Sequence, residues 1–175
     1  NAATNKPVSV IYSLNGQQAA NYTIQSSIMT ASITPKSVSV VGISIDNKSY
    51  DGTNNATISG IANISGVITN DLFNVTIAGN PIATFNDASL GMNKPIIVVG
   101  YELQGTQASN YILTQPSTLT ANIVAKTITI SGLTISDKVY DRSLTATISG
   151  TPILNGIITS EESSVALTGT LIATF

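Results

Sequence analysis

The sequence predicts an all-β protein made of tandem β-sandwich or grasp-like modules of about ninety residues, joined end to end by near-continuous strands. Two observations support the all-β class. Polar and apolar residues alternate with a period of two in segments rich in β-branched residues, as in strands with one buried face. Gly, Asn-Gly and Pro interrupt these segments at short intervals, and no apolar stripe of helical spacing extends over three turns.

The alternating segments give the expected strands in chain order. The two longest are residues 37–45 and 127–135, and the alternation of the first slips once near Gly42. Shorter runs are found at residues 8–12, 74–77, 96–101 and 111–113. Turn signals such as Asn15-Gly16 and Asn155-Gly156 lie between them, so we expect strands connected by tight turns.

The chain also repeats itself with a period of about ninety residues. One set of matching words is Lys48-Ser49-Tyr50-Asp51 with Lys138-Val139-Tyr140-Asp141, followed by Ala-Thr-Ile-Ser-Gly and then Ile-Ala-Thr-Phe in both copies. A second set pairs Asn5-Lys6-Pro7 with Asn93-Lys94-Pro95, and Asn21-Tyr22 with Asn110-Tyr111. We therefore expect residues 1–36 to be the C-terminal half of a repeat, 37–126 a complete repeat, and 127–175 the N-terminal half of another.

The boundaries between repeats contain no flexible linker. Alternation continues almost unbroken through residues 30–40 and 120–130, and Pro35 stiffens the first boundary. A Gly/Ser-rich linker would coil, whereas an extended connection keeps its length and resists bending. The sequence therefore predicts a semi-rigid rod.

Composition excludes several functions. Charged residues make up 9% of the chain and the formal net charge is −2, so there is no basic surface for nucleic acid. We expect no direct membrane insertion, because no apolar run is long enough for a spanning helix. The chain has no His and no Cys, which removes the commonest general bases and nucleophiles. We do not expect an enzyme.

The phrase Lys-x-Tyr-Asp-Gly, the later Asn-Tyr and the Thr-Ala-x-Ile-x-x-Lys at each boundary resemble the YDG/MBG-type repeats of large bacterial surface adhesins, such as filamentous-haemagglutinin-like and gliding-adhesin-like proteins. The second copy departs from this pattern with Arg142 in place of Gly52, and Asn70-Asp71 becomes Glu161-Glu162. The resemblance implies an extracellular, cell-surface stalk or filament segment without catalytic residues. Its partners would be neighbouring repeats, with surface glycans or proteins bound through other regions.

The repeated polar and aromatic residues are interpreted as structural. We expect each Tyr to bury its ring and bond its hydroxyl to the backbone, while the neighbouring Asp or Asn closes a turn. The set comprises Tyr50, Asp51, Tyr140, Asp141, Asn21, Tyr22, Asn110 and Tyr111. No cofactor is expected. Calcium is the one metal considered, with oxygen ligands from Asp46, Asp51, Asp137 and Asp141.

Two alternatives to a passive stalk stay open. Each repeat could bind a glycan or a host protein, although aromatic residues make up 5% of the chain and Trp is absent. Residues 1–36 and 127–175 also add up to about one repeat, so copies could complete one another head to tail in an extracellular fibre.

Overall fold

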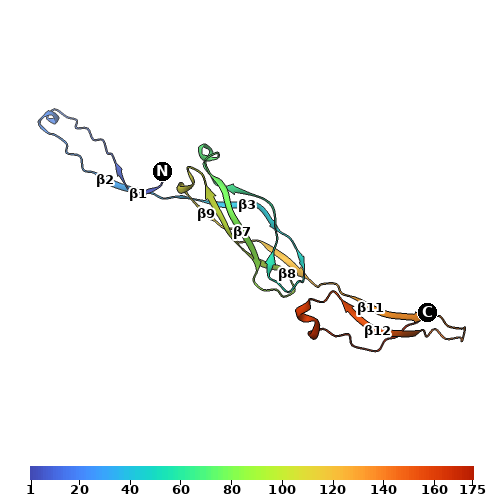
Figure 1. The fold of residues 1–175 in the computed structure, drawn as a ribbon. Helices are drawn as coiled ribbons and strands as arrows, with labels where there is room; N and C mark the ends of the chain where they lie inside the picture. The colour runs from blue at the N-terminus through green and yellow to red at the C-terminus, as the bar shows by residue number, and fades with distance from the viewer.

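The computed structural model describes residues 1–175 and confirms the all-β class. Twelve strands account for the regular structure, and the helical segments are 3₁₀ turns of three to six residues. None of these helical segments has the length and apolar character needed to cross a bilayer. The chain forms an elongated row of an N-terminal part (residues 1–35), a central part (36–124) and a C-terminal part (125–175) (Figure 1).

The central part contains two sheets. The larger has the order β4-β10-β8-β7-β5, and the smaller has the order β6-β3-β9. Pairing is antiparallel except between β3 and β9 and between β4 and β10, where chain-distant strands run parallel. The strands are β3 Lys36–Ile45, β4 Lys48–Ser49, β5 Asn55–Ala56, β6 Ile58–Ser65, β7 Thr76–Phe85, β8 Gly91–Gln104, β9 Tyr111–Thr114 and β10 Thr120–Val124.

Both sheets contribute to the core of the central part. Phe85, Ile123 and Val98 of the larger sheet are at most 2% exposed, and they belong to the same cluster as Val40 of β3. A smaller cluster of Val38, Val75 and Tyr111 lies beside it. Every buried residue except Ala146 falls between Val38 and Ile123, so the central part holds nearly all of the buried apolar surface.

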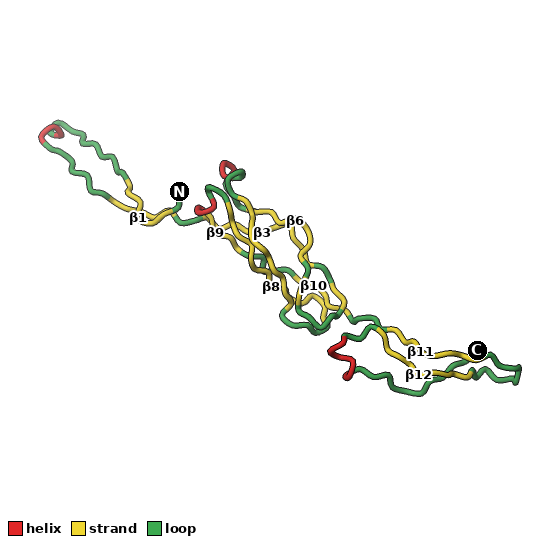
Figure 2. Tube along the Cα trace, viewed as in Figure 1, coloured by secondary structure: helices red, strands yellow, loops and turns green.

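The two outer parts are open hairpins with almost no buried residues (Figure 2). β1 Ala3–Val8 pairs with β2 Met29–Ile33 in the N-terminal part, and β11 Thr129–Ser136 pairs with β12 Thr147–Asn155 in the C-terminal part. The expected strand at residues 8–12 is wrong, because β1 ends at Val8. In the central part the matching segment of β8 pairs with β7, and the N-terminal part has no strand in that position.

Facing glycines mark the slips in alternation. Gly42 of β3 and Gly60 of β6 both have positive φ, and the register between these strands shifts between Val41 and Ile43. A Cβ at Gly60 would lie 2.4 Å from the carbonyl oxygen of Gly42. The backbones therefore approach more closely than any side chain permits, and the strands bend there as at a β-bulge.

Strands follow one another closely where the parts meet. Thr34 and Pro35 alone separate β2 from β3, and residues 125–128 separate β10 from β11. The backbone N–H of Tyr50 donates to the carbonyl oxygen of Val124, 2.8 Å away, so the end of β10 is tied to the loop after β4.

Candidate functional site at the junction of the central and C-terminal parts

A lysine organises the loop that carries the Tyr-Asp pair. Lys48 Nζ lies 2.7 Å from Asp51 Oδ1 and donates to the carbonyl oxygens of Thr53 and Asn55, both at 3.0 Å. The same ammonium lies 5.9 Å from the centre of the Phe85 ring, within the range of a cation–π contact. Lys48 thus joins the loop to the core of the central part.

Asp51 closes the turn after the tyrosine. Its Oδ1 accepts hydrogen bonds from the backbone N–H of Thr53 at 2.8 Å and from the Thr53 hydroxyl at 2.9 Å. The hydrogen bond from Lys48 is the main cause that lowers the pKa of Asp51 to about 2, and the bonds from Thr53 add to it. The carboxylate therefore stays ionised well into the acidic range.

The second copy of the motif repeats this arrangement. Lys138 Nζ lies 2.7 Å from Asp141 Oδ1, donates to the carbonyl oxygens of Ser143 and Thr145, and lies 5.7 Å from the centre of the Phe175 ring. Arg142 has φ 65° where Gly52 has φ 77°. The left-handed backbone is therefore kept in both copies, although only the first copy has glycine at this position.

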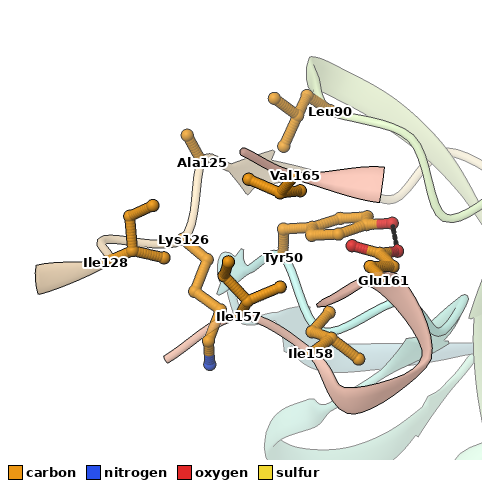
Figure 3. Close-up of a pocket in the computed structure, with 9 residues that line it drawn as sticks. All are labelled: Tyr50, Leu90, Ala125, Lys126, Ile128, Ile157, Ile158, Glu161 and Val165. Atoms are coloured by element: carbon orange, nitrogen blue, oxygen red, sulfur yellow. Dashed lines mark hydrogen bonds between the residues drawn. The ribbon is translucent and has the colours of Figure 1, made fainter. Parts of the chain in front are cut away.

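Tyr50 makes the contact between the central and C-terminal parts. The sequence predicts a backbone partner for its hydroxyl, but in the structure the hydroxyl donates to Glu161 Oε1, in the 3₁₀ segment η4 Thr159–Ser164 (Figure 3). This hydrogen bond is the main cause that raises the pKa of Tyr50 above its ordinary value. The two residues are 111 positions apart, so the bond links separate parts of the chain directly.

Apolar side chains lie beside this hydrogen bond. They line a cavity of about 310 Å³ beside the Tyr50 ring, and the labelled side chains in Figure 3 come from both parts. A Cβ at Gly52 would lie 3.5 Å from Ile158 Cδ1, so the loop after Tyr50 also lies against the residue that precedes η4. The apolar lining is Leu90, Ala125, Ile128, Ile157, Ile158 and Val165.

The residue ninety positions before Glu161 is Asp71, one position away from the pairing of Asn70-Asp71 with Glu161-Glu162 in the sequence analysis, and it binds a different tyrosine. Asp71, in η2 Thr69–Asp71, accepts a hydrogen bond from the Tyr111 hydroxyl at 2.7 Å, and the same hydroxyl accepts one from the backbone N–H of Ile68 at 3.2 Å. Burial is the main cause that raises the pKa of Tyr111. The acidic residue of this turn therefore accepts a hydrogen bond from a tyrosine hydroxyl in both copies. Asp71 binds Tyr111 of its own part, and Glu161 binds Tyr50 of the preceding part.

The structure also places the Asn-Tyr pairs. Asn21 and Asn110 each end a 3₁₀ turn, η1 Ala19–Asn21 and η3 Ala108–Asn110, and each Nδ2 donates to a glutamine Oε1 at 2.6 Å. Asn110 Oδ1 also accepts from the backbone N–H of Ala2 at 2.7 Å, which ties the N-terminal part to the central one. Tyr111 is buried, whereas Tyr22 and Tyr140 are exposed.

The four calcium candidates are not brought together. No group of three or more acidic, His or Cys side chains lies within reach of a single ion anywhere in residues 1–175. Asp51 and Asp141 are instead paired with lysines. These carboxylates act as turn and lysine partners in this fold.

Sequence reasoning missed Lys48, Lys138 and Glu161 as site residues. The lysines could have been found, because each recurs with its Tyr-Asp pair at the same spacing. Glu161 carried a weaker signal, namely an acidic residue at the equivalent position in both copies. The pairing of Glu161 with Tyr50 could not be predicted from the sequence. Nothing in the repeat indicates that Tyr50 and Tyr111 both bind an acidic residue at this turn.

A known protein family matches the central part of the chain. Residues 34–119 match the model of the YDG domain. This YDG-type region begins two residues before β3 and ends just before β10, so it takes in Tyr50-Asp51 and all of the central part except its last strand. Neither the curated proteins nor the solved structures include a match to the chain.

Proposed function

We propose that the chain is a non-catalytic, semi-rigid spacer segment of a secreted bacterial cell-surface adhesin, in which YDG-type β-sandwich modules follow one another with direct contacts between neighbours. The contact of Tyr50 with Glu161, beside a cavity lined by apolar side chains, is the observation that carries the proposal. A connection of four residues at this junction leaves little slack, and the side-chain contact restricts the bending that remains.

The surroundings of the junction support a mechanical role. Lys48 and Asp51 hold the Tyr50 loop, and the backbone of this loop is hydrogen-bonded to the end of β10. The loop that carries Tyr50 to Glu161 is therefore fixed to the central part. The titratable side chains that line the junction cavity are Tyr50, Lys126 and Glu161, and the Tyr50 hydroxyl is bonded to the Glu161 carboxylate, so this pair serves as a contact between the two parts. The partners of such a segment are neighbouring repeats at the bacterial surface.

Distance measurements between spin labels test the rigidity of the junction. The chain has no native Cys, so labels on Ile61→Cys of β6 and Ile135→Cys of β11 report on the two parts without interference. Both side chains are exposed, and the substitutions leave the core intact. We expect a single narrow distance distribution for a dilute sample.

The matched control carries six Gly/Ser residues inserted between Ala125 and Lys126. This insertion replaces an extended connection by a flexible coil and should broaden the distribution clearly. Glu161→Ala and Tyr50→Phe should broaden it to a smaller extent, because each removes the same hydrogen bond. A distribution as broad in the unaltered chain as in the insertion variant would rule out a semi-rigid spacer.

A further inference from the structure

Two segments of the central part, the entry segment (residues 36–49) and the exit segment (residues 111–124), run side by side in the same direction. The entry segment contains β3 and β4, and the exit segment contains β9 and β10. β3 pairs parallel with β9, and β4 pairs parallel with β10. In both pairings the partners are 75 positions apart, so the two segments keep one register from one end of the central part to the other.

Hydrogen bonds outside the strands also join the two segments. The backbone N–H of Asn122 donates to Asn47 Oδ1 at 2.7 Å, again across 75 positions. Just beyond the last strand pair, the backbone N–H of Tyr50 donates to the carbonyl oxygen of Val124 at 2.8 Å. Each segment has its first strand in the smaller sheet and its second strand in the larger one, so the segments pass from one sheet to the other together.

The strands that begin and end the central part both lie inside their sheets. β3 has β6 and β9 as neighbours, and β10 has β4 and β8. Val38 and Val40 of β3 are 3% and 8% exposed, and Ala121 and Ile123 of β10 are 4% and 1% exposed. Neither strand can slide along its axis without breaking hydrogen bonds on two sides and drawing buried side chains past the core.

Tension along the chain reaches the central part at the ends of these segments. Pro35 connects the start of β3 to the N-terminal part, and Ala125 connects the end of β10 to the C-terminal part. Tension therefore pulls the entry segment toward one outer part and the exit segment toward the other, in a direction close to that of the strands (Figure 1). Because the two segments are parallel, this force slides one along the other. The pairs at both ends of the central part then resist it at the same time, instead of opening one after another.

We propose that the central part bears tensile load along the chain through the shear of the entry and exit segments. Resistance to tension goes beyond resistance to bending, because it concerns the pairing within one part and not the contact between two parts. The use of this resistance in a row of modules rests on the spacer role proposed above.

Single-molecule force spectroscopy with two pulling directions tests the proposal in the full chain, which has no native Cys. Handles attached at Thr34→Cys and Ala125→Cys load the two segments in shear. The matched control has handles at Thr34→Cys and Ser65→Cys, which open β3 from β6 pair by pair from the Ser39–Ser65 end. The substituted residues are exposed, so both versions keep the same core. We expect the rupture force of the central part to be at least about twofold higher in shear, because many hydrogen bonds must break together.

Asn47→Ala tests the link between the segments. It leaves the N–H of Asn122 without its acceptor, so the unfolding rate at a fixed shear force should rise about fivefold. The rate in the control direction should not change, since it depends on the pairs of β3 with β6. Asn63→Ala is the matched control, because the Asn63 amide donates to the carbonyl oxygen of Ile61 within β6 and lies outside both segments.

Equal rupture forces in the two directions, or a lower force in shear, would overturn the proposal. An equal rise of the Asn47→Ala unfolding rate in both directions would overturn the role assigned to the Asn47 side chain. The spin-label distances are measured without load and concern the junction, so the two proposals can fail separately. A broad distance distribution with a high shear force would reject the semi-rigid spacer alone, and a narrow distribution with a low shear force would reject the load-bearing role alone.

Discussion

Replacing Gly60 by Ala tests the close approach of strands β3 and β6. Gly60 has φ 87°, and an added Cβ would lie 2.4 Å from the carbonyl oxygen of Gly42 and 3.4 Å from Cα of Ile43. The nearest atom belongs to the backbone of a paired strand, so it cannot turn away as a flexible side chain would. The two strands must separate by about 1 Å to restore a normal contact.

Two effects lower the stability of the Gly60→Ala variant. The left-handed backbone costs a residue with a Cβ about 1–2 kcal/mol, and the forced separation adds about 1–3 kcal/mol, as overpacking does in other cores. We therefore expect Gly60→Ala to lower the free energy of unfolding by about 2–5 kcal/mol, a large share of the stability of a small domain. Urea unfolding followed by circular dichroism measures this loss.

Gly66→Ala separates the two sources. Gly66 has φ 98°, but an added Cβ would meet nothing closer than 3.6 Å. Only the backbone cost applies there, so the expected loss is about 1–2 kcal/mol. Equal losses for the two variants would refute the claim that close strand approach, and not positive φ alone, requires glycine at position 60.

Two further predictions concern the Tyr-Asp loops. Arg142→Gly should slow amide hydrogen exchange in residues 137–145, because it relieves about 1 kcal/mol of left-handed strain. Unchanged exchange in this variant would contradict the strain at φ 65°. Gly52→Ala makes the opposite change and should lower the free energy of unfolding of the central part by a similar amount, about 1 kcal/mol. The pKa of Asp51 and of Asp87 is about 2 in the folded chain, chiefly through hydrogen bonds from Lys48 and Lys94, and the ordinary value is 3.8. Since the folded-state pKa is depressed, the stability from these carboxylates is present above about pH 4 and is lost as pH falls toward 2. Urea midpoints at pH 5, 4, 3 and 2 should show this decline, and Lys48→Met combined with Lys94→Met should flatten it; a decline of equal size in that variant would assign the acid sensitivity to other groups.

Local patterns predicted the strands well where a strand depends on its own residues. The alternation of residues 37–45 gave β3, and the slip at Gly42 marked the point where the register shifts. The same reasoning failed at residues 8–12, although the matching residues 96–101 lie in β8. The difference is the partner strand β7, which one copy has and the other lacks, and no local pattern reports it.

The junction contact was less accessible to sequence reasoning. The repeat indicated Tyr50 and Asp51, but the partner of the Tyr50 hydroxyl lies 111 residues away on a turn with no distinctive pattern. Lys48 recurs with the same repeated motif, so its membership of the site could be predicted, but its role could not, because a lysine in a polar loop is usually solvated. Its role depends on the three-dimensional course of the loop, which brings two carbonyl oxygens, a carboxylate and an aromatic ring to one ammonium.

Tyr50 and Tyr140 occupy equivalent positions of the repeat but make different contacts. Both belong to the same motif, and the lysine and aspartate beside each make the same bonds. Tyr50 is partly buried against Glu161 of the next part, whereas Tyr140 is 84% exposed. The same motif therefore leads to two environments, and the difference between them is a 3₁₀ turn of another part of the chain that brings the Glu161 carboxylate within hydrogen-bond distance of Tyr50.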